Sequence, residues 1–532
     1  MSIYFFKKIN QSNFFYIFFL GLFSFYVNYF YSNLGVFPID TFLHYDSGYK
    51  ILNNDYPIKD YWVVSGVVVD FFQAFFFYIF GVNWNSYVIH SSLINFTTSI
   101  LTFYFFKTLN LSQPVSLFFS ICFSVLAYTI SGTPFVDLHA THFCLIATYL
   151  TIYSINNFKK NYLWTVTIIF YFLAFFSKQV PTAYLAILNS LILGLYFFTT
   201  KKLDSFKTII VNLIFFSLVV IFTLQYLNID FTQFYIQFIG YPREFGSLRV
   251  NAINFSFLKF FSNFKFLLIP FVLLLFLKIR TFKTKDKNVF LIKNLNFFIY
   301  SSMFISFLIH QILTKNQIFI YFLIPLTFGY LYSEINLYTF PKKKLLRSLI
   351  LIFTLFITIK YHIRYNEGRK FHELFNTNIS NSISFESLNI SLNKLKWINP
   401  FFVEEPLEEL QLLKKVIINL EQKKDNIVLI THYLFLDSIT KKKLNSLNRT
   451  YTLDGASSPI KGSKYFEKYK SYIFKNLARK NIKEILFIKE EKIDQRILTN
   501  ILDKNCYLLI EDEIFFIYKL ELSCINYSSK NI

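Results

Sequence analysis

Long apolar runs dominate the first two thirds of the chain. Each run is close to 20 residues, the length of helix that crosses roughly 30 Å of hydrocarbon. The pattern predicts about eleven transmembrane helices, over residues 13–34, 86–106, 112–130, 140–157, 162–177, 180–199, 207–228, 262–280, 295–314, 317–338 and 345–361. The expected fold of residues 1–362 is therefore a polytopic α-helical membrane domain.

The pattern changes after residue 362. Apolar runs shorten to strand length at 427–431, 485–488, 506–510 and 514–518, and amphipathic helical stretches at 405–424 and 463–481 alternate with them. Short apolar runs between helical stretches are typical of a sheet covered by helices. Residues 363–532 are expected to form a small soluble α/β domain.

Two of the connections between predicted helices, 35–85 and 229–261, are more than linkers. The first contains an apolar run from Asp70 to Gly81, too short to span, which predicts a helix lying in the membrane interface. The second mixes aromatic and charged residues with glycine and proline, a composition that allows bending. We expect it to form a mobile lid over the membrane surface.

Composition agrees with a membrane protein, since 54% of the residues are hydrophobic and 21% are aromatic. The net charge of +22 does not indicate nucleic acid, because the lysines accompany an excess of Phe, Ile and Asn of the kind an AT-rich genome produces. No nucleic-acid partner is expected. Lys7 and Lys8 precede an apolar stretch that no small-residue cleavage site follows, which predicts a signal anchor.

The distribution of charge predicts the orientation. Alternate connections carry about 18 and about eight basic residues, and the richer set belongs in the cytoplasm. The N-terminus is then cytoplasmic. With eleven spans the C-terminal domain is periplasmic, or extracytoplasmic, in a bacterial inner (plasma) membrane.

The four cysteines do not form a CxxC motif, so neither zinc nor a redox motif is indicated. Cys506 and Cys524 lie in the polar C-terminal part, where a disulfide and two free thiols are both open.

Carboxylates gather in the first outer connection, which holds Asp40, Asp46, Asp55, Asp60 and Asp70. Acidic residues in a membrane domain are costly unless they face water, a partner or a substrate. Asp40 and Asp46, just after the first helix, are candidates for a general base that removes a proton from an acceptor hydroxyl. The alternative is a solvated, helix-capping or metal-free structural role.

Three further groups lie on the same predicted side. Lys178, at the outer end of the fifth helix, suits a phosphate, or alternatively a lipid headgroup. Asp137, His139 and His142 could bind a divalent ion, line a polar substrate wall or make structural hydrogen bonds. His310, Lys315 and Gln317 would face the same outer cavity, or would anchor the chain at the interface.

The chain resembles the GT-C superfamily of membrane glycosyltransferases, nearest the branch of dolichyl-phosphate-mannose-protein mannosyltransferases and aminoarabinose transferases (family 39-like). The resemblance covers about residues 1–360. Asp40-Thr41 stands at the family's Asp-Glu pair, and Asn54-Asp55 stands at a small-residue turn. Three later elements match Tyr56-Pro57-Ile58-Lys59-Asp60-Tyr61-Trp62, Phe80-Gly81 and Phe176-Ser177-Lys178-Gln179.

Two departures from the family pattern bear on the site. Thr41 replaces the family's Glu, and Val68 stands near a position where proline is common. Asp46 is therefore a second candidate for the catalytic role.

The resemblance implies transfer of a sugar from a polyprenyl-phosphate donor to a glycolipid, polysaccharide or protein. Asp40 would deprotonate or orient the acceptor. Lys178, with Arg243 or Arg249, would hold the donor phosphate and stabilise it as the leaving group. His44, two residues before Asp46, and Asp60, within the matching element Tyr56 to Trp62, are expected to contact substrate. No cofactor is implied, and a divalent metal is possible but not indicated. The C-terminal domain, outside the resemblance, would bind the acceptor or be structural.

Two other functions compete with this hypothesis. A lipid-linked oligosaccharide flippase or transporter should have broken helices and charges at mid-membrane, whereas these predicted helices are almost free of charge. An O-antigen polymerase or ligase would share a lipid-linked donor, but its chemistry is expected in a large late outer loop.

Overall fold

The chain forms two compact units, which we describe separately. The computed structural model describes residues 11–157, 160–253, 256–280, 287–314, 320–337, 342–521 and 523–525. We call Met1–Asn33, Val88–Val219 and Ile253–Thr377 the helical unit, and Leu34–Tyr87, Val220–Ala252 and Asn378–Ile532 the mixed unit. Residues 35–85 and most of 229–261 thus belong to the same unit as the C-terminal residues.

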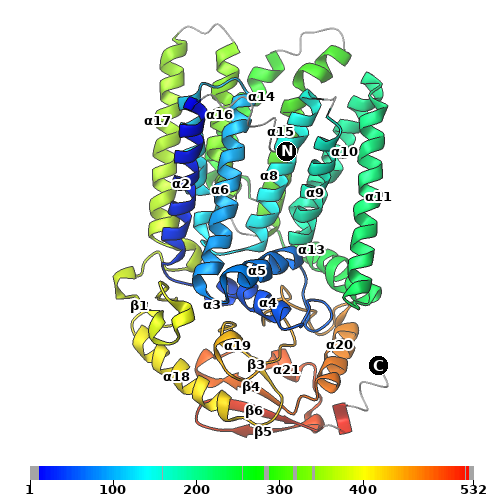
Figure 1. The fold of residues 1–532 in the computed structure, drawn as a ribbon, viewed down its shortest axis with the longest axis vertical. Coiled ribbons are helices and arrows are strands. Elements are labelled where there is room, and N and C mark those ends of the chain that lie inside the picture. The colour runs from blue at the N-terminus through cyan, green and yellow to red at the C-terminus, as the bar shows by residue number, and fades with distance from the viewer. Residues whose placement is uncertain are drawn as a thin grey trace. The chain divides into compact units, whose positions relative to one another are not determined.

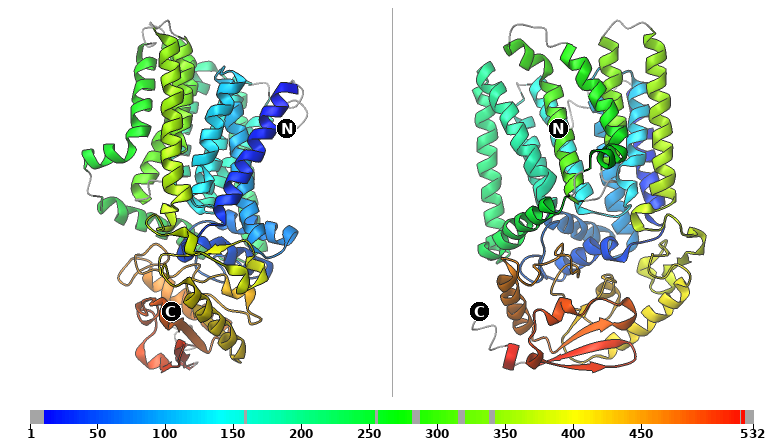
Figure 2. Two further views of the ribbon diagram at one scale, coloured as in Figure 1. Left: turned by 90° about the vertical axis from the view of Figure 1, so that its left-hand side faces the viewer. Right: turned by 180° about the vertical axis from the view of Figure 1, so that it is seen from behind.

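The long helices of the helical unit run roughly parallel to one another (Figures 1 and 2). They are α2 (Gln11–Ser32), α6 (Trp84–Thr108), α7 (Gln113–Leu126), α8 (Val136–Asn156), α9 (Tyr162–Ser177), α10 (Gln179–Thr200), α11 (Leu203–Tyr226), α14 (Phe257–Arg280), α15 (Lys287–Thr314), α16 (Leu323–Leu337) and α17 (Lys343–Tyr361). The short turns η1 (Tyr128–Ile130), η5 (His362–Glu367) and η6 (Lys370–His372) belong to the same unit.

Eight stretches in the described residues are long and apolar enough to cross a membrane. They are Phe14–Ser32, Gln113–Ile130, Val136–Asn156, Gln179–Thr200, Leu203–Tyr226, Phe257–Ile279, Asn294–Thr314 and Lys343–Glu367. The other three predicted spans correspond to helices α6, α9 and α16. Of these, α9 and α16 are short, with 16 and 15 residues. Helix α6 is long enough but is not apolar enough to be one of the eight stretches. The protein is therefore a membrane protein with several apolar helices, and a count of eleven spans stays a prediction.

Helix α8 lies at the centre of the helical unit. Of its span, 94% is buried, and α9, α10 and α15 pack against it. The polar side chains that α8 carries are therefore interior groups, which must find partners inside the protein.

The mixed unit contains a four-stranded sheet of order β3-β4-β6-β5. Strand β3 (Ile427–Ile430) pairs in parallel with β4 (Glu484–Ile488), so that Val428 lies opposite Ile485. Strand β6 (Phe515–Leu520) is antiparallel to β4 and to β5 (Tyr507–Glu511). The four strands predicted from short apolar runs are confirmed. A small ladder joins β1 (Ile383–Ser384) to β2 (Lys396–Trp397).

Helices α18 (Pro406–Gln422) and α20 (Phe466–Arg479) correspond to the two predicted amphipathic stretches, and α19 (Leu436–Ile439) and α21 (Arg496–Thr499) are short. Proline at the first turn and glutamates beside it favour the start of α18. Helix α20 buries Phe466, Tyr469, Ile473 and Leu477, spaced three or four residues apart, in the core formed with the sheet.

The segment 35–85 adds three helices to the mixed unit: α3 (Pro38–Thr41), α4 (Leu43–Leu52) and α5 (Val67–Phe80). Helix α5 is the apolar helix that we expected in this segment. One of its faces is buried, whereas the side chains of Phe75, Tyr78 and Phe80 are 57%, 79% and 49% exposed. An exposed aromatic face of this kind is typical of a helix at a membrane surface.

Residues 231–251 are helical, with α12 (Phe231–Tyr235), the π-helical turn η2 (Ile236–Gly240) and α13 (Tyr241–Asn251). The Tyr241 hydroxyl donates to the carbonyl of Ser458 at 2.7 Å, and Glu244 accepts from the backbone N–H of Lys464 at 2.9 Å. This segment therefore packs on residues 455–464 of its own unit, and its proposed mobility stays a prediction.

A disulfide joins Cys506 and Cys524, whose Cα atoms are 5.4 Å apart. The sequence had left this pairing open. Cys122 and Cys144 are buried free thiols of the helical unit.

Candidate functional site

The first candidate residues lie in the mixed unit, where Asp46 forms an ion pair with Lys50 inside helix α4. The Lys50 ammonium also donates to Ser446 Oγ at 2.5 Å. Both charged side chains are buried, and Asp46 Oδ1 has no hydrogen-bond partner among the described residues. Burial raises the pKa of Asp46 above its ordinary value, and the charge of Lys50 opposes that rise.

Asp70 is a second buried carboxylate among the candidate residues of the mixed unit. Its Oδ1 lies 2.6 Å from His44 Nδ1, and its Oδ2 pairs with the guanidinium of Arg449. Burial lowers the pKa of His44, so we assign a neutral ring whose Nδ1–H donates to Asp70. A neutral histidine and an arginine together satisfy both oxygens of a fully buried carboxylate.

The two remaining paired acids of the segment reach cations of the C-terminal region. Asp55 lies 3.0 Å from Lys443, and Asp60 lies 2.6 Å from Arg479. The backbone of Trp62 donates to the carbonyl of Leu447 at 2.8 Å. The motif that ends in Trp62 thus ties residues 34–87 to the C-terminal part of the same unit.

Asp40 has a different environment from Asp46. It lies on the short helix α3, begun by Pro38, and its side chain is only partly buried. Because Asp46 is buried with Lys50, Asp40 is the more accessible of the two catalytic candidates.

The two arginines expected near the donor phosphate lie on helix α13. Arg243 is exposed, and the guanidinium of Arg249 lies 4.4 Å from the centre of the Phe245 ring. A guanidinium on an aromatic face keeps its charge and its hydrogen-bond donors for other partners.

A second group of candidate residues meets in the helical unit around Asp137. Its Oδ1 lies 2.6 Å from Lys178 Nζ and 2.8 Å from His310 Nε2. Asp137 is in the first turn of α8, Lys178 is an extended residue between α9 and α10, and His310 is in the last turns of α15. Side chains that the sequence predicted separately are thus brought together at the ends of four helices.

Exposure differs among these three residues. The side chains of Asp137 and His310 are 5% and 1% exposed, whereas Lys178 is 22% exposed. Lys178 is therefore the member of the group that solvent or a ligand can reach.

The other two histidines on α8 make contacts within the helical unit. His139 lies 2.9 Å from His90 Nε2 and 2.5 Å from the hydroxyl of Tyr128. His142 Nδ1 lies 2.6 Å from the carbonyl of Leu138. Both histidines thus make hydrogen bonds within the protein, which is one of the three roles that the sequence left open for them.

Two predicted residues, Lys315 and Gln317, lie outside the described residues. Within the described part of the chain, no group of three or more His, Cys, Asp and Glu side chains is placed to hold a metal ion.

The cations that engage the acidic segment were missed by the sequence analysis, with Arg449 and Arg479 the main examples. No local signal identifies them, because they lie hundreds of residues from their partners. Lys50 is different: it follows Asp46 by four residues, the spacing that joins opposite charges on a helix.

Comparisons with known proteins add no family assignment. No protein-family model matches the chain, and no curated protein matches it either.

Proposed function

We propose that the protein is a membrane glycosyltransferase that uses a polyprenyl-phosphate-linked sugar as donor. The observation that carries the proposal is the group in which Lys178 and His310 converge on Asp137. Ionisable residues among apolar membrane helices are costly and usually functional. A reachable ammonium beside a second nitrogen donor suits a phosphate carried by a lipid.

In the proposed reaction an acceptor hydroxyl attacks C1 of the donor sugar. The bond from C1 to the phosphate oxygen breaks, and polyprenyl phosphate leaves with the bonding electrons. Lys178, with Arg243 or Arg249 as further donors, would stabilise the negative charge that develops on the leaving phosphate. Asp137 would hold the ammonium of Lys178 in position before the donor binds.

Asp40 is our choice for the group that takes the proton of the acceptor hydroxyl. A general base must reach the proton that it removes. Asp46 would first have to leave its buried pair with Lys50, whereas Asp40 is partly exposed. Asp46 then has a positioning role in α4. His44 and Asp60 make protein contacts, and their contact with substrate is part of the proposal.

We further propose that the protein lies in a bacterial inner membrane with the mixed unit outside the cytoplasm. The asymmetry of basic residues supports this orientation. The Cys506–Cys524 disulfide supports it as well, because disulfides persist mainly in oxidising compartments. We expect three kinds of partner, namely the donor, the acceptor glycan or protein, and membrane lipids.

The test is the donor dependence of a Lys178→Ala variant, measured with radiolabelled undecaprenyl-phosphate glucose, mannose and aminoarabinose in detergent micelles. We expect the wild type to release undecaprenyl phosphate from at least one donor, and Lys178→Ala to raise the donor KM about tenfold or more, because it loses a charged hydrogen bond. Lys201→Ala, an exposed lysine on the same unit, is the matched control.

An unchanged donor KM in Lys178→Ala contradicts the phosphate role. Movement of intact lipid-linked sugar across a vesicle membrane without transfer would support a flippase instead.

A further inference from the structure

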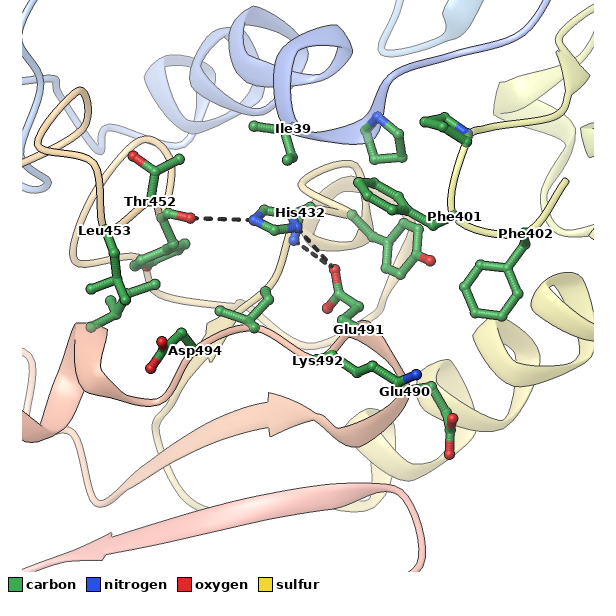
Figure 3. A pocket seen from close by; sticks show the side chains of 16 residues that line it. Ile39, Phe401, Phe402, His432, Thr452, Leu453, Glu490, Glu491, Lys492 and Asp494 are labelled. Carbon is green, nitrogen blue, oxygen red and sulfur yellow. Dashed lines mark hydrogen bonds and ion pairs between the residues drawn. The ribbon is translucent and has the colours of Figure 1, made fainter. Parts of the chain in front are cut away.

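The mixed unit holds a pocket of about 720 Å³ that none of the roles above uses (Figure 3). Pockets that bind small molecules span roughly 300–1,000 Å³. This pocket forms where the parallel strands β3 and β4 end, since His432 follows β3 and Glu491 follows β4. In α/β sheets, ligands bind at the carboxyl ends of parallel strands.

Aromatic side chains form one wall of the pocket, with Phe401, Phe402 and Tyr433 among the lining residues. Phe401 is 53% exposed, and its ring is stacked against Phe37, with ring centres 6.0 Å apart. Such flat apolar faces suit a ligand ring that turns a row of C–H groups toward them.

Polar groups of the pocket are fixed in place. Glu491 Oε1 accepts from the backbone N–H of His432 at 2.8 Å, and its Oε2 accepts from Thr431 Oγ1 at 2.6 Å. His432 Nε2 lies 3.2 Å from the carbonyl of Tyr451 and donates to it. Burial raises the pKa of Glu491 to about 8 and lowers that of His432, so both are neutral at pH 7.

Charge at this pocket gives an anionic ligand no attraction. Among the described lining residues the charge of Lys492 is balanced by that of Glu490, and Asp494 is paired with Arg496. The phosphate of a lipid-linked donor would meet no surplus of positive charge here. A neutral ligand with hydroxyl groups would meet aromatic faces and fixed polar atoms.

The pocket also adjoins the proposed general base. Pro38 and Ile39 line it, and Asp40 is the next residue of α3. A ligand held in this pocket would therefore lie beside the helix that carries Asp40.

We propose that this pocket binds the acceptor as an uncharged glycan, which stacks a sugar ring on Phe401 and hydrogen-bonds to His432 and Glu491. The choice of a glycan rests on the proposed function. The pocket does not attract the donor, because its charges balance and leave no surplus cation for a phosphate. Acceptor and donor are thus recognised by two different surfaces, the charge-balanced pocket of the mixed unit and the Lys178 group of the helical unit.

The test is saturation-transfer NMR on the full-length protein in micelles without any donor. The probes are N,N′,N″-triacetylchitotriose and maltotriose as neutral trisaccharides and trigalacturonate as an anionic one. We expect saturation transfer to at least one neutral probe and none to trigalacturonate. Phe401→Ala should weaken binding of the neutral probe about tenfold or more. Leu508→Ala, an exposed apolar side chain on β5, is its control.

A second variant tests the charge argument where Phe401→Ala reduces the yield of folded protein. Glu490 is exposed, so Glu490→Lys should fold normally and should allow trigalacturonate to bind. Glu513→Lys, in the β5–β6 hairpin, reverses a charge away from the pocket and should change nothing.

Absence of binding by both neutral probes overturns the proposal, and so does binding that Phe401→Ala and Glu490→Lys leave unchanged. Binding without sugar transfer would contradict the proposed enzyme and leave the ligand class of the pocket intact. Sugar transfer without binding of either neutral probe would support the proposed enzyme and contradict the ligand class proposed for the pocket.

Discussion

Asp70 is a buried carboxylate whose two oxygens depend on His44 and Arg449. Removing one member of a buried ion pair leaves an uncompensated charge, at a cost of about 3–5 kcal/mol. Arg449→Ala should therefore lower the free energy of unfolding of the mixed unit by about 3 kcal/mol or more. Loss of thermal stability in detergent, followed by intrinsic fluorescence, measures this.

Arg496→Ala is the matched control for Arg449→Ala. Arg496 also pairs with an aspartate, Asp494, but its side chain is 71% exposed. Exposed pairs contribute roughly 0–1 kcal/mol. Equal losses in the two variants would show that the Arg449 pair is no more important than a surface pair.

Glu491 makes stability depend on pH. Its pKa is raised from 4.5 to about 8 by burial. The unfolded chain ionises this residue near pH 4.5 while the folded chain keeps it protonated, so its contribution to stability is full below that pH and is lost as pH rises to about 8. Glu491→Gln cannot ionise and should gain melting temperature relative to the wild type between pH 5 and 8.

The difference in melting temperature between Glu491→Gln and the wild type should then stay constant above about pH 8. Thr431, His432, Glu409 and Tyr433 are the other groups that set the pKa of Glu491, and they are unchanged in the variant. Glu513→Gln, an exposed position, is the control. A difference in melting temperature that does not vary between pH 5 and 8 would mean that the pKa of Glu491 is not raised in the folded protein.

At the scale of elements, helix α16 contacts α6 closely at Gly329. A Cβ atom added there would lie 2.3 Å from a ring carbon of Phe106. Gly329→Ala should therefore destabilise the helical unit by about 1–3 kcal/mol through overpacking. Thermal unfolding in micelles tests this.

Gly194 provides the opposite case on helix α10. A Cβ atom there meets nothing within 4 Å, so alanine should stabilise the helix by up to about 1 kcal/mol. If Gly329→Ala and Gly194→Ala both stabilise the protein, the close contact between α6 and α16 is not present in solution.

Periodicity in the sequence predicted most elements of both units. The strands from β3 to β6 and helices α18 and α20 begin and end within a few residues of the predicted bounds. This succeeds because burial of a strand or of one helix face imposes a local apolar pattern. The three less apolar or shorter helices, α6, α9 and α16, show the limit, since length and hydropathy alone do not establish that a helix spans a membrane.

The contacts within the candidate sites were predicted less completely. The sequence identified Asp137, Lys178 and His310 one at a time, by type and by position near helix ends. It did not reveal that Lys178 and His310 share one carboxylate, nor that Arg449 pairs with Asp70. Such contacts join residues 41 to 379 positions apart, and no local pattern records them.

The orientation of the whole molecule determines which residues face the cytoplasm. Lys201 lies in a basic connection expected inside, and Lys461 lies in the mixed unit expected outside, and both are exposed. A membrane-impermeant maleimide applied to intact spheroplasts should label Lys461→Cys and leave Lys201→Cys unlabelled until the membrane is opened. The opposite labelling would reverse the proposed orientation.

Background labelling in that experiment should be low. Cys122 and Cys144 are buried, and Cys506 and Cys524 form a disulfide. The parent protein without added cysteine gives the baseline.

The most direct test of the central claim is the rate of sugar transfer by Asp40→Asn. Product formation from labelled undecaprenyl-phosphate sugar should be followed at saturating donor, with Asp230→Asn, an exposed aspartate that caps α12, as the matched control. We expect Asp40→Asn to lower kcat by about 100-fold or more, as loss of a general base does, and Asp230→Asn to retain the wild-type rate. Transfer at the wild-type rate by Asp40→Asn would contradict the role of Asp40 as general base.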